Sequence, residues 1–116
     1  MITAQDLLDQ LSLKVIAGEK GLDNEVTGGY VCDLLSWVMS HAQKGDAWIT
    51  VQTNINVAAV ALLTEVACVI IPENISVDAN TIQKSNEENI PILSGAISSY
   101  QLACKLEKVL RGDDDK

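Results

Sequence analysis

Three short runs of β-branched and apolar residues, separated by two segments of helical length, place the strongest constraint on the fold of this chain. The runs cover residues 47–51, 67–71 and 90–93. The segments between them, 54–65 and 78–89, are each long enough for one helix. Strands and helices that alternate at this spacing predict right-handed crossover connections and a mostly parallel sheet.

Two further strands and two flanking helices are predicted outside this repeat. The strands cover residues 13–17 and 26–32, and the helices cover 3–11 and 98–110. Thr3 with Asp6, and Ser98 with Gln101, have the spacing of a capping box at the start of the two helices. We therefore expect one domain over residues 1–111, folded as a three-layer α/β/α sandwich with about five strands. The acidic end 112–116 is expected to be disordered, as a solvated tail or an artificial remnant.

Two helices of this pattern carry more apolar residues than one buried stripe needs. The crossover helix around residues 56–63 is apolar nearly all round, and we expect it to be deeply packed. The helix that follows Asp33 either contacts both its own sheet and a partner subunit or is buried in the core. Its candidate dimer-interface residues are Leu34, Leu35, Trp37, Val38 and Met39.

The glycine pair Gly28-Gly29 interrupts the otherwise β-prone segment 26–32. Adjacent glycines weaken a strand, so they indicate either a bulge or the close approach of another group to the backbone. If that group is a ligand, the pair belongs to a binding turn at the start of a helix. Both alternatives stay open on the sequence.

Four spaced motifs resemble those of the DRTGG domain family and extend over roughly residues 1–110. They are Thr27-Gly28-Gly29-Tyr30, Asp33-Leu34-Leu35-Ser36, Gly45-Asp46-Ala47-Trp48-Ile49-Thr50 and Asn56-Val57-Ala58-Ala59-Val60-Ala61. The chain departs from the name-giving Asp-Arg-Thr-Gly-Gly, with Glu25-Val26-Thr27-Gly28-Gly29 in its place. The resemblance implies a small α/β regulatory domain that dimerises, found alone or in the nucleotide-binding regulatory region of some pyrophosphatases, and related to the N-terminal domain of HPr kinase/phosphorylase.

Small polar residues gather where the predicted strands end. In an open parallel sheet, ligands bind beyond the carboxyl ends of the strands, where backbone amides, helix starts and side-chain amides can hold a small polar or nucleotide-like ligand. The same residue types also cap helices and form turns, and Asp33 is placed to be a helix N-cap. The candidate ligand-binding residues are Thr27, Gly28, Gly29, Asp33, Thr50, Gln52 and Asn54.

Composition and the inventory of reactive side chains favour a protein that is not an enzyme. One His and one Arg leave few groups for acid–base or phosphoryl chemistry. No phosphate-binding loop, dinucleotide fingerprint or metal-ligand spacing is present, so we expect no cofactor and no metal. The net charge of −8 argues against nucleic acid as a partner. The three Cys are odd in number and are expected to be free thiols, and no apolar run is long enough to span a membrane. Both features predict a cytoplasmic protein.

Two main functions from different classes remain, beside a third alternative, an enzyme of unrecognised type. The first is a regulatory module that homodimerises, binds a small polar ligand such as an adenine nucleotide at the carboxyl edge of the sheet, and transmits its state to a partner protein. The second is a scaffold subunit without a small-molecule ligand. A ligand module predicts an ordered pocket around Gly28, Gly29, Asp33, Thr50 and Gln52, whereas a scaffold predicts that these groups hydrogen-bond one another.

Overall fold

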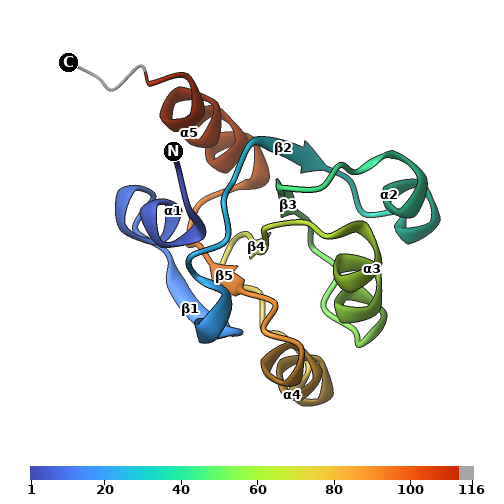
Figure 1. Ribbon diagram of the computed structural model, residues 1–116. Helices are drawn as coiled ribbons and strands as arrows, with labels where there is room; N and C mark the ends of the chain where they lie inside the picture. Colours follow the sequence, from blue (N-terminus) through green and yellow to red (C-terminus); the bar gives the residue numbers. More distant parts are fainter. Residues whose placement is uncertain (113–116) are drawn as a thin grey trace.

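A five-stranded sheet between two layers of helices forms the molecule, as the computed structural model shows for the described residues 1–112 (Figure 1). The strands are β1 (Lys14–Ala17), β2 (Gly28–Val31), β3 (Asp46–Ile49), β4 (Cys68–Ile71) and β5 (Ile92–Ser94). They lie in the order β1-β5-β4-β3-β2; β1 is antiparallel to β5, and the other neighbours are parallel. The predicted sandwich is confirmed. The disorder expected beyond Gly112 lies outside the described residues.

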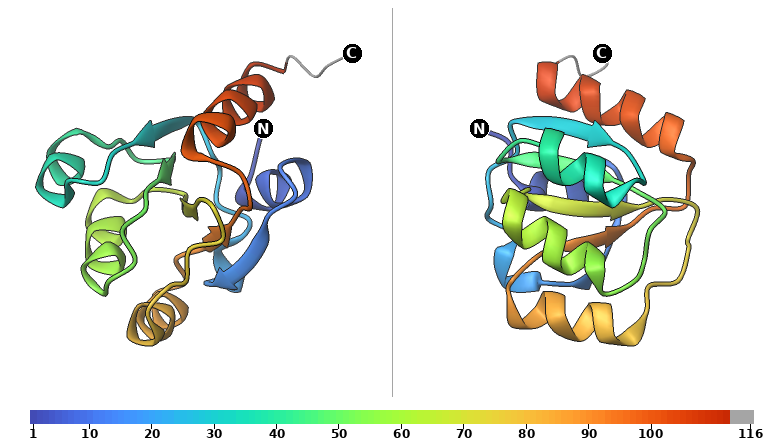
Figure 2. Two further views of the ribbon diagram at one scale, coloured as in Figure 1. Left: turned by 180° about the vertical axis from the view of Figure 1, so that it is seen from behind. Right: turned by 90° about the vertical axis from the view of Figure 1, so that its right-hand side faces the viewer.

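The helices divide between the two faces of the sheet according to their connections (Figure 2). The three crossover helices, α2 (Leu35–His41), α3 (Asn56–Thr64) and α4 (Ala79–Glu87), lie on one face. Strands β2 to β5 step across the sheet in one direction, so right-handed crossovers place all three helices on the same side. The other face is covered by α1 (Ala4–Gln10) and α5 (Ser99–Arg111), and a short 3₁₀ helix η1 (Glu19–Gly21) follows β1.

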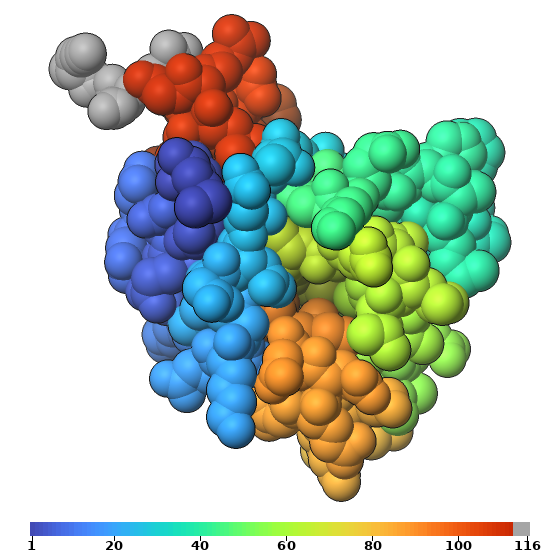
Figure 3. Space-filling model, viewed as in Figure 1, coloured from blue at the N-terminus to red at the C-terminus, as the bar shows by residue number. Residues whose placement is uncertain are grey.

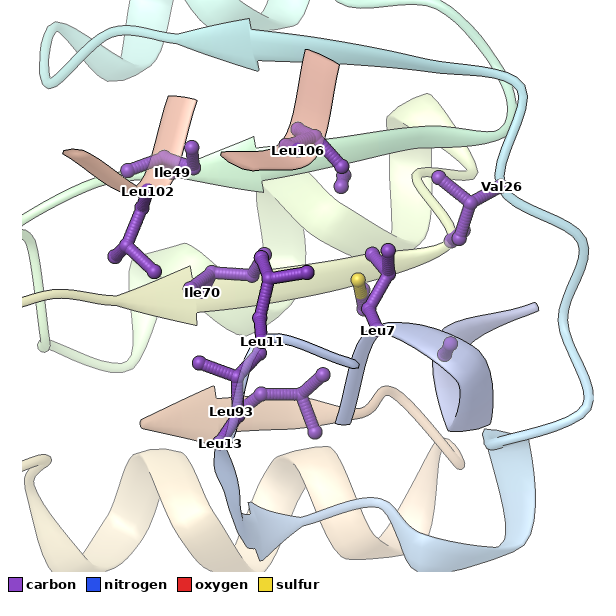
Figure 4. Close-up of a cluster of buried hydrophobic side chains, with 13 residues drawn as sticks. Leu7, Leu11, Leu13, Val26, Ile49, Ile70, Leu93, Leu102 and Leu106 are labelled. Carbon is purple, nitrogen blue, oxygen red and sulfur yellow. The ribbon is translucent and has the colours of Figure 1, made fainter. Parts of the chain in front are cut away.

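Alternate strand residues face the two helical layers and build a core on each side. Ala47 and Ile49 of β3 pack with α1 and α5, whereas Trp48 between them packs with α2 and α3. Figure 4 shows the first of these clusters, in which the helical side chains Leu7, Leu102 and Leu106 lie over the central strands. Its labelled members are Leu7, Leu11, Leu13, Val26, Ile49, Ile70, Leu93, Leu102 and Leu106.

Both predicted capping boxes are present. The Thr3 backbone N–H donates to Asp6 Oδ2 at 2.8 Å, and the Asp6 N–H donates to Thr3 Oγ1 at 3.3 Å. At the start of α5, the Ser98 N–H donates to Gln101 Oε1 at 3.3 Å and the Gln101 N–H to Ser98 Oγ at 3.2 Å. These pairs satisfy backbone amides that have no partner within their helix.

The expectation that α3 is deeply packed is wrong for half of its circumference. Val57, Ala58, Val60 and Ala61 are buried against the sheet. Ile55, Ala59, Leu62 and Leu63 are instead exposed. The helix is a single outer layer, so the described residues cover only the side of α3 that faces the sheet.

Candidate functional site

Four of the predicted ligand-binding residues come together at the carboxyl edge of the sheet, where they hydrogen-bond one another. Asp33 Oδ1 accepts from Thr50 Oγ1 at 2.7 Å and from the Val51 N–H at 2.9 Å. Gln52 Nε2 donates to the Asp33 carbonyl oxygen at 2.9 Å, and Asn54 Nδ2 donates to Gln52 Oε1 at 3.2 Å. The cluster therefore ties the loop after β2 to the loop after β3.

Asp33 is not the N-cap of α2, contrary to one of its two expected roles. The N-cap position is Leu34, which makes no side-chain cap bond. The Asp33 carboxylate instead bonds the hydroxyl of Thr50, which is 1% exposed, and so satisfies a buried polar group from another loop. A hydrogen bond to a charged acceptor is stronger than one between neutral groups, which explains this choice of partner.

The other three predicted ligand-binding residues do not lie at this edge. Thr27 precedes β2 and Gly28 and Gly29 begin it, so these residues lie toward its amino end, whereas Asp33 follows its carboxyl end. The register of β2 with β3 is unbroken, which rules out the expected alternative of a bulge. Side chains instead approach both glycines closely: a Cβ on Gly29 would lie 2.6 Å from Leu106 Cδ2, and one on Gly28 would lie 2.8 Å from Asp46 Oδ1.

A hollow of about 570 Å³ lies at the opposite, amino edge of the parallel strands, a location that the sequence did not predict. Figure 3 shows this hollow surrounded by three parts of the chain: α3, α4 and the light-blue segment that precedes β2. Lys20, Lys44, Glu25, Glu65 and Glu88 are among its lining residues, so charges of both signs surround it. These charged residues lie in the segments that precede successive strands. Charged residues at those positions are the sequence feature that could have predicted the hollow.

The candidate dimer-interface residues divide between core and surface. Val38 is completely buried against β3 and α3, so it is not available to a partner, and Leu35 is half-buried. Leu34, Trp37 and Met39 are each at least half exposed. The Trp37 ring stacks on His41, with centroids 4.0 Å apart, at the C-terminal end of α2.

The carboxyl-edge cluster can bind polar groups but offers little for catalysis. It contains one carboxylate, one hydroxyl and two side-chain amides. Within residues 1–112, no group of three His, Cys, Asp or Glu side chains is placed to hold a metal ion. No helix in that part of the chain is long and apolar enough to span a bilayer.

Comparison with known proteins places the chain in a family. The fold is similar to the crystal structure of the CBS and DRTGG domains of the regulatory region of Clostridium perfringens pyrophosphatase, complexed with the activator diadenosine tetraphosphate. The TM-score is 0.70 at 15% sequence identity, and the match covers 86% of this chain and 44% of the other chain. This chain therefore spans less than half the length of the chain that it matches. No curated protein matches the chain. The model of the DRTGG domain family matches residues 6–109. Because that match covers most of its length, the chain belongs to the DRTGG domain family.

Proposed function

We propose that this chain is a non-catalytic regulatory module that acts in the cytoplasm as a homodimer, binds a small polar ligand and transmits the bound state to a partner protein. The observation that carries the proposal is the similarity of fold to a regulatory region complexed with an adenine-nucleotide activator.

The proposed ligand site is the carboxyl-edge cluster of Asp33, Thr50, Gln52 and Asn54, without Thr27, Gly28 and Gly29, which lie toward the other end of β2. Gln52 and Asn54 are only partly buried, and their amides can exchange the mutual hydrogen bond for bonds to an adenine or ribose group. No Lys or Arg lies in residues 34–43 or 47–64. The cluster therefore suits the nucleoside part of a nucleotide rather than its phosphates.

Thermal unfolding with diadenosine tetraphosphate, AMP and adenosine tests this proposal. A ligand at a hundredfold excess over its Kd stabilises the native state by about 2.7 kcal/mol, which corresponds to a rise in Tm of roughly 10 °C. We expect Gln52→Ala to abolish the rise. Gln83→Ala is the matched control, since Gln83 also bonds another side chain but lies on α4. A rise that survives in Gln52→Ala would place the ligand elsewhere.

A second candidate function is a scaffold subunit without a small ligand. The observation in its favour is that Asp33, Thr50, Gln52 and Asn54 already satisfy one another. If none of the three compounds changes the Tm while the protein remains dimeric, this second function replaces the first.

A further inference from the structure

We propose that the outward surface of α3, continued by α2, is the interface at which a second copy of this chain binds. The inference rests on the homodimer of the proposed function and locates its contact. Among the described residues, eight of the ten exposed large apolar side chains lie between residues 31 and 63. Seven of them form what we call the α2–α3 face: Leu34, Trp37, Met39, Val51, Ile55, Leu62 and Leu63. Val31 is excluded, because it lies beside Ala103, Leu106 and Leu110 of α5, on the opposite face of the sheet.

The exposed side of α3 has the spacing of a helix that packs on another helix. Ile55, Ala59, Leu62 and Leu63 follow one another at intervals of four, three and one, which brings them to one side of the helix. The small Ala59 lies in the middle and allows the backbone of a neighbouring helix to approach closely. α2 packs beside α3 on the same face of the sheet (Figure 2), and it also carries exposed apolar side chains, Trp37 and Met39.

The exposed area of the α2–α3 face approaches what a stable dimer needs. The seven side chains are between 42% and 71% exposed. At roughly 100 Å² each, these seven side chains supply up to about 700 Å², close to the roughly 800 Å² that each partner contributes to an interface of standard size.

The distribution of charge identifies the occupant as a second copy. The chain has 16 acidic and 8 basic residues, yet none of them lies in residues 34–43 or 47–64. Two molecules of net charge −8 repel each other, and this repulsion is weakest where no carboxylates are brought together. A basic partner protein would gain more from the acidic surface elsewhere. In a two-fold dimer this uncharged surface faces its own copy. The contact then brings no carboxylates together, and it needs no basic partner.

Sedimentation equilibrium of charge variants on α3 tests the proposal. Leu63 is 71% exposed, so Leu63→Glu leaves the core intact but places two like charges in the interface. We expect the Kd of the dimer to rise on the order of a hundredfold or more, with an unchanged circular dichroism spectrum. Tyr100→Glu is the control, because Tyr100 is 78% exposed on α5, which covers the opposite face of the sheet. This variant should remain dimeric.

A pair of opposite charges at Ala59 tests the symmetry of the interface. Ala59→Glu and Ala59→Lys should each be monomeric alone, and an equimolar mixture should recover a heterodimer. If Leu63→Glu and both Ala59 variants stay dimeric, the α2–α3 face is not the interface, although the homodimer stands. If the wild type is monomeric, both the interface and the homodimer are rejected. The Tm measurements with nucleotides test ligand binding independently of either result.

Discussion

At the scale of single residues, Gly29 shows how a position predicted to contact a ligand can serve packing instead. Its backbone is regular strand, so Gly29→Ala would stabilise an uncrowded site by reducing the freedom of the unfolded chain. The contact with Leu106 reverses that sign. We expect Gly29→Ala to lower the free energy of unfolding by about 1–3 kcal/mol, measured by urea denaturation.

The matched test of this contact is a double-mutant cycle with Leu106→Ala. Removing the Leu106 side chain should make the additional loss from Gly29→Ala smaller than in the wild type, because the two substitutions act on the same contact. Equal losses in both backgrounds would mean that crowding against α5 is not why a glycine occupies this position.

Cys68 provides a prediction on pH at the same scale. Its burial in the core raises the pKa of the thiol from 9.0 to about 12. In the unfolded chain, the Cys68 thiol ionises near its ordinary pKa. The protonated thiol therefore contributes its full stability to the native state below pH 9, and this contribution is lost as the pH rises toward 12. The free energy of unfolding should fall with a slope of up to about 1.4 kcal/mol per pH unit from this group.

Comparison with Cys68→Ala isolates the effect of the thiol. The variant loses a pH-independent amount from the cavity that it creates, but between pH 9 and 11 its stability should fall less steeply than that of the wild type. Urea denaturation at several pH values measures both slopes. Identical slopes would show that Cys68 does not remain protonated in the native state.

At the scale of elements, the capping boxes link a local sequence pattern to global stability. α5 carries Leu102 and Leu106 into the core, so weakening its first turn weakens the packing of one whole face. We expect Ser98→Ala to lower the free energy of unfolding by about 1 kcal/mol. Ser99→Ala, one position into the helix, is the control and should change it little. Equal effects of the two variants in urea denaturation would contradict the capping role of Ser98.

At the scale of the whole molecule, the acidic net charge and the uncharged α2–α3 face predict how salt acts on the dimer. Long-range repulsion between two copies is strong at about 0.01 M salt and largely screened at about 0.15 M. The dimer should therefore become tighter as NaCl is raised, by at least a few-fold in Kd over this range. Sedimentation equilibrium at the two salt concentrations measures it. A dimer that weakens with salt would instead be held by ion pairs, which the face does not contain.

The sequence by itself determined the type and order of the elements. Apolar periodicity, β-branched runs and the boxes at Thr3 and Ser98 act over one or two turns of chain, so they can be interpreted without knowing the fold. Strand–helix alternation then required a parallel sheet, because right-handed crossovers permit few other arrangements. The resemblance to the DRTGG family, now confirmed over residues 6–109, also depended on motifs with local spacing.

Only the tertiary structure decided what each candidate site residue contacts. The partner of Asp33 is Thr50 rather than the start of α2, and the neighbour of Gly29 is Leu106 from the last helix. Thr27 and Asp33 lie beyond opposite ends of β2, although six positions of sequence separate them. The outer side of α3 is exposed because no further element of the described chain covers it. Each outcome depends on groups distant in sequence competing for one place in space, and a local pattern carries no information about that competition.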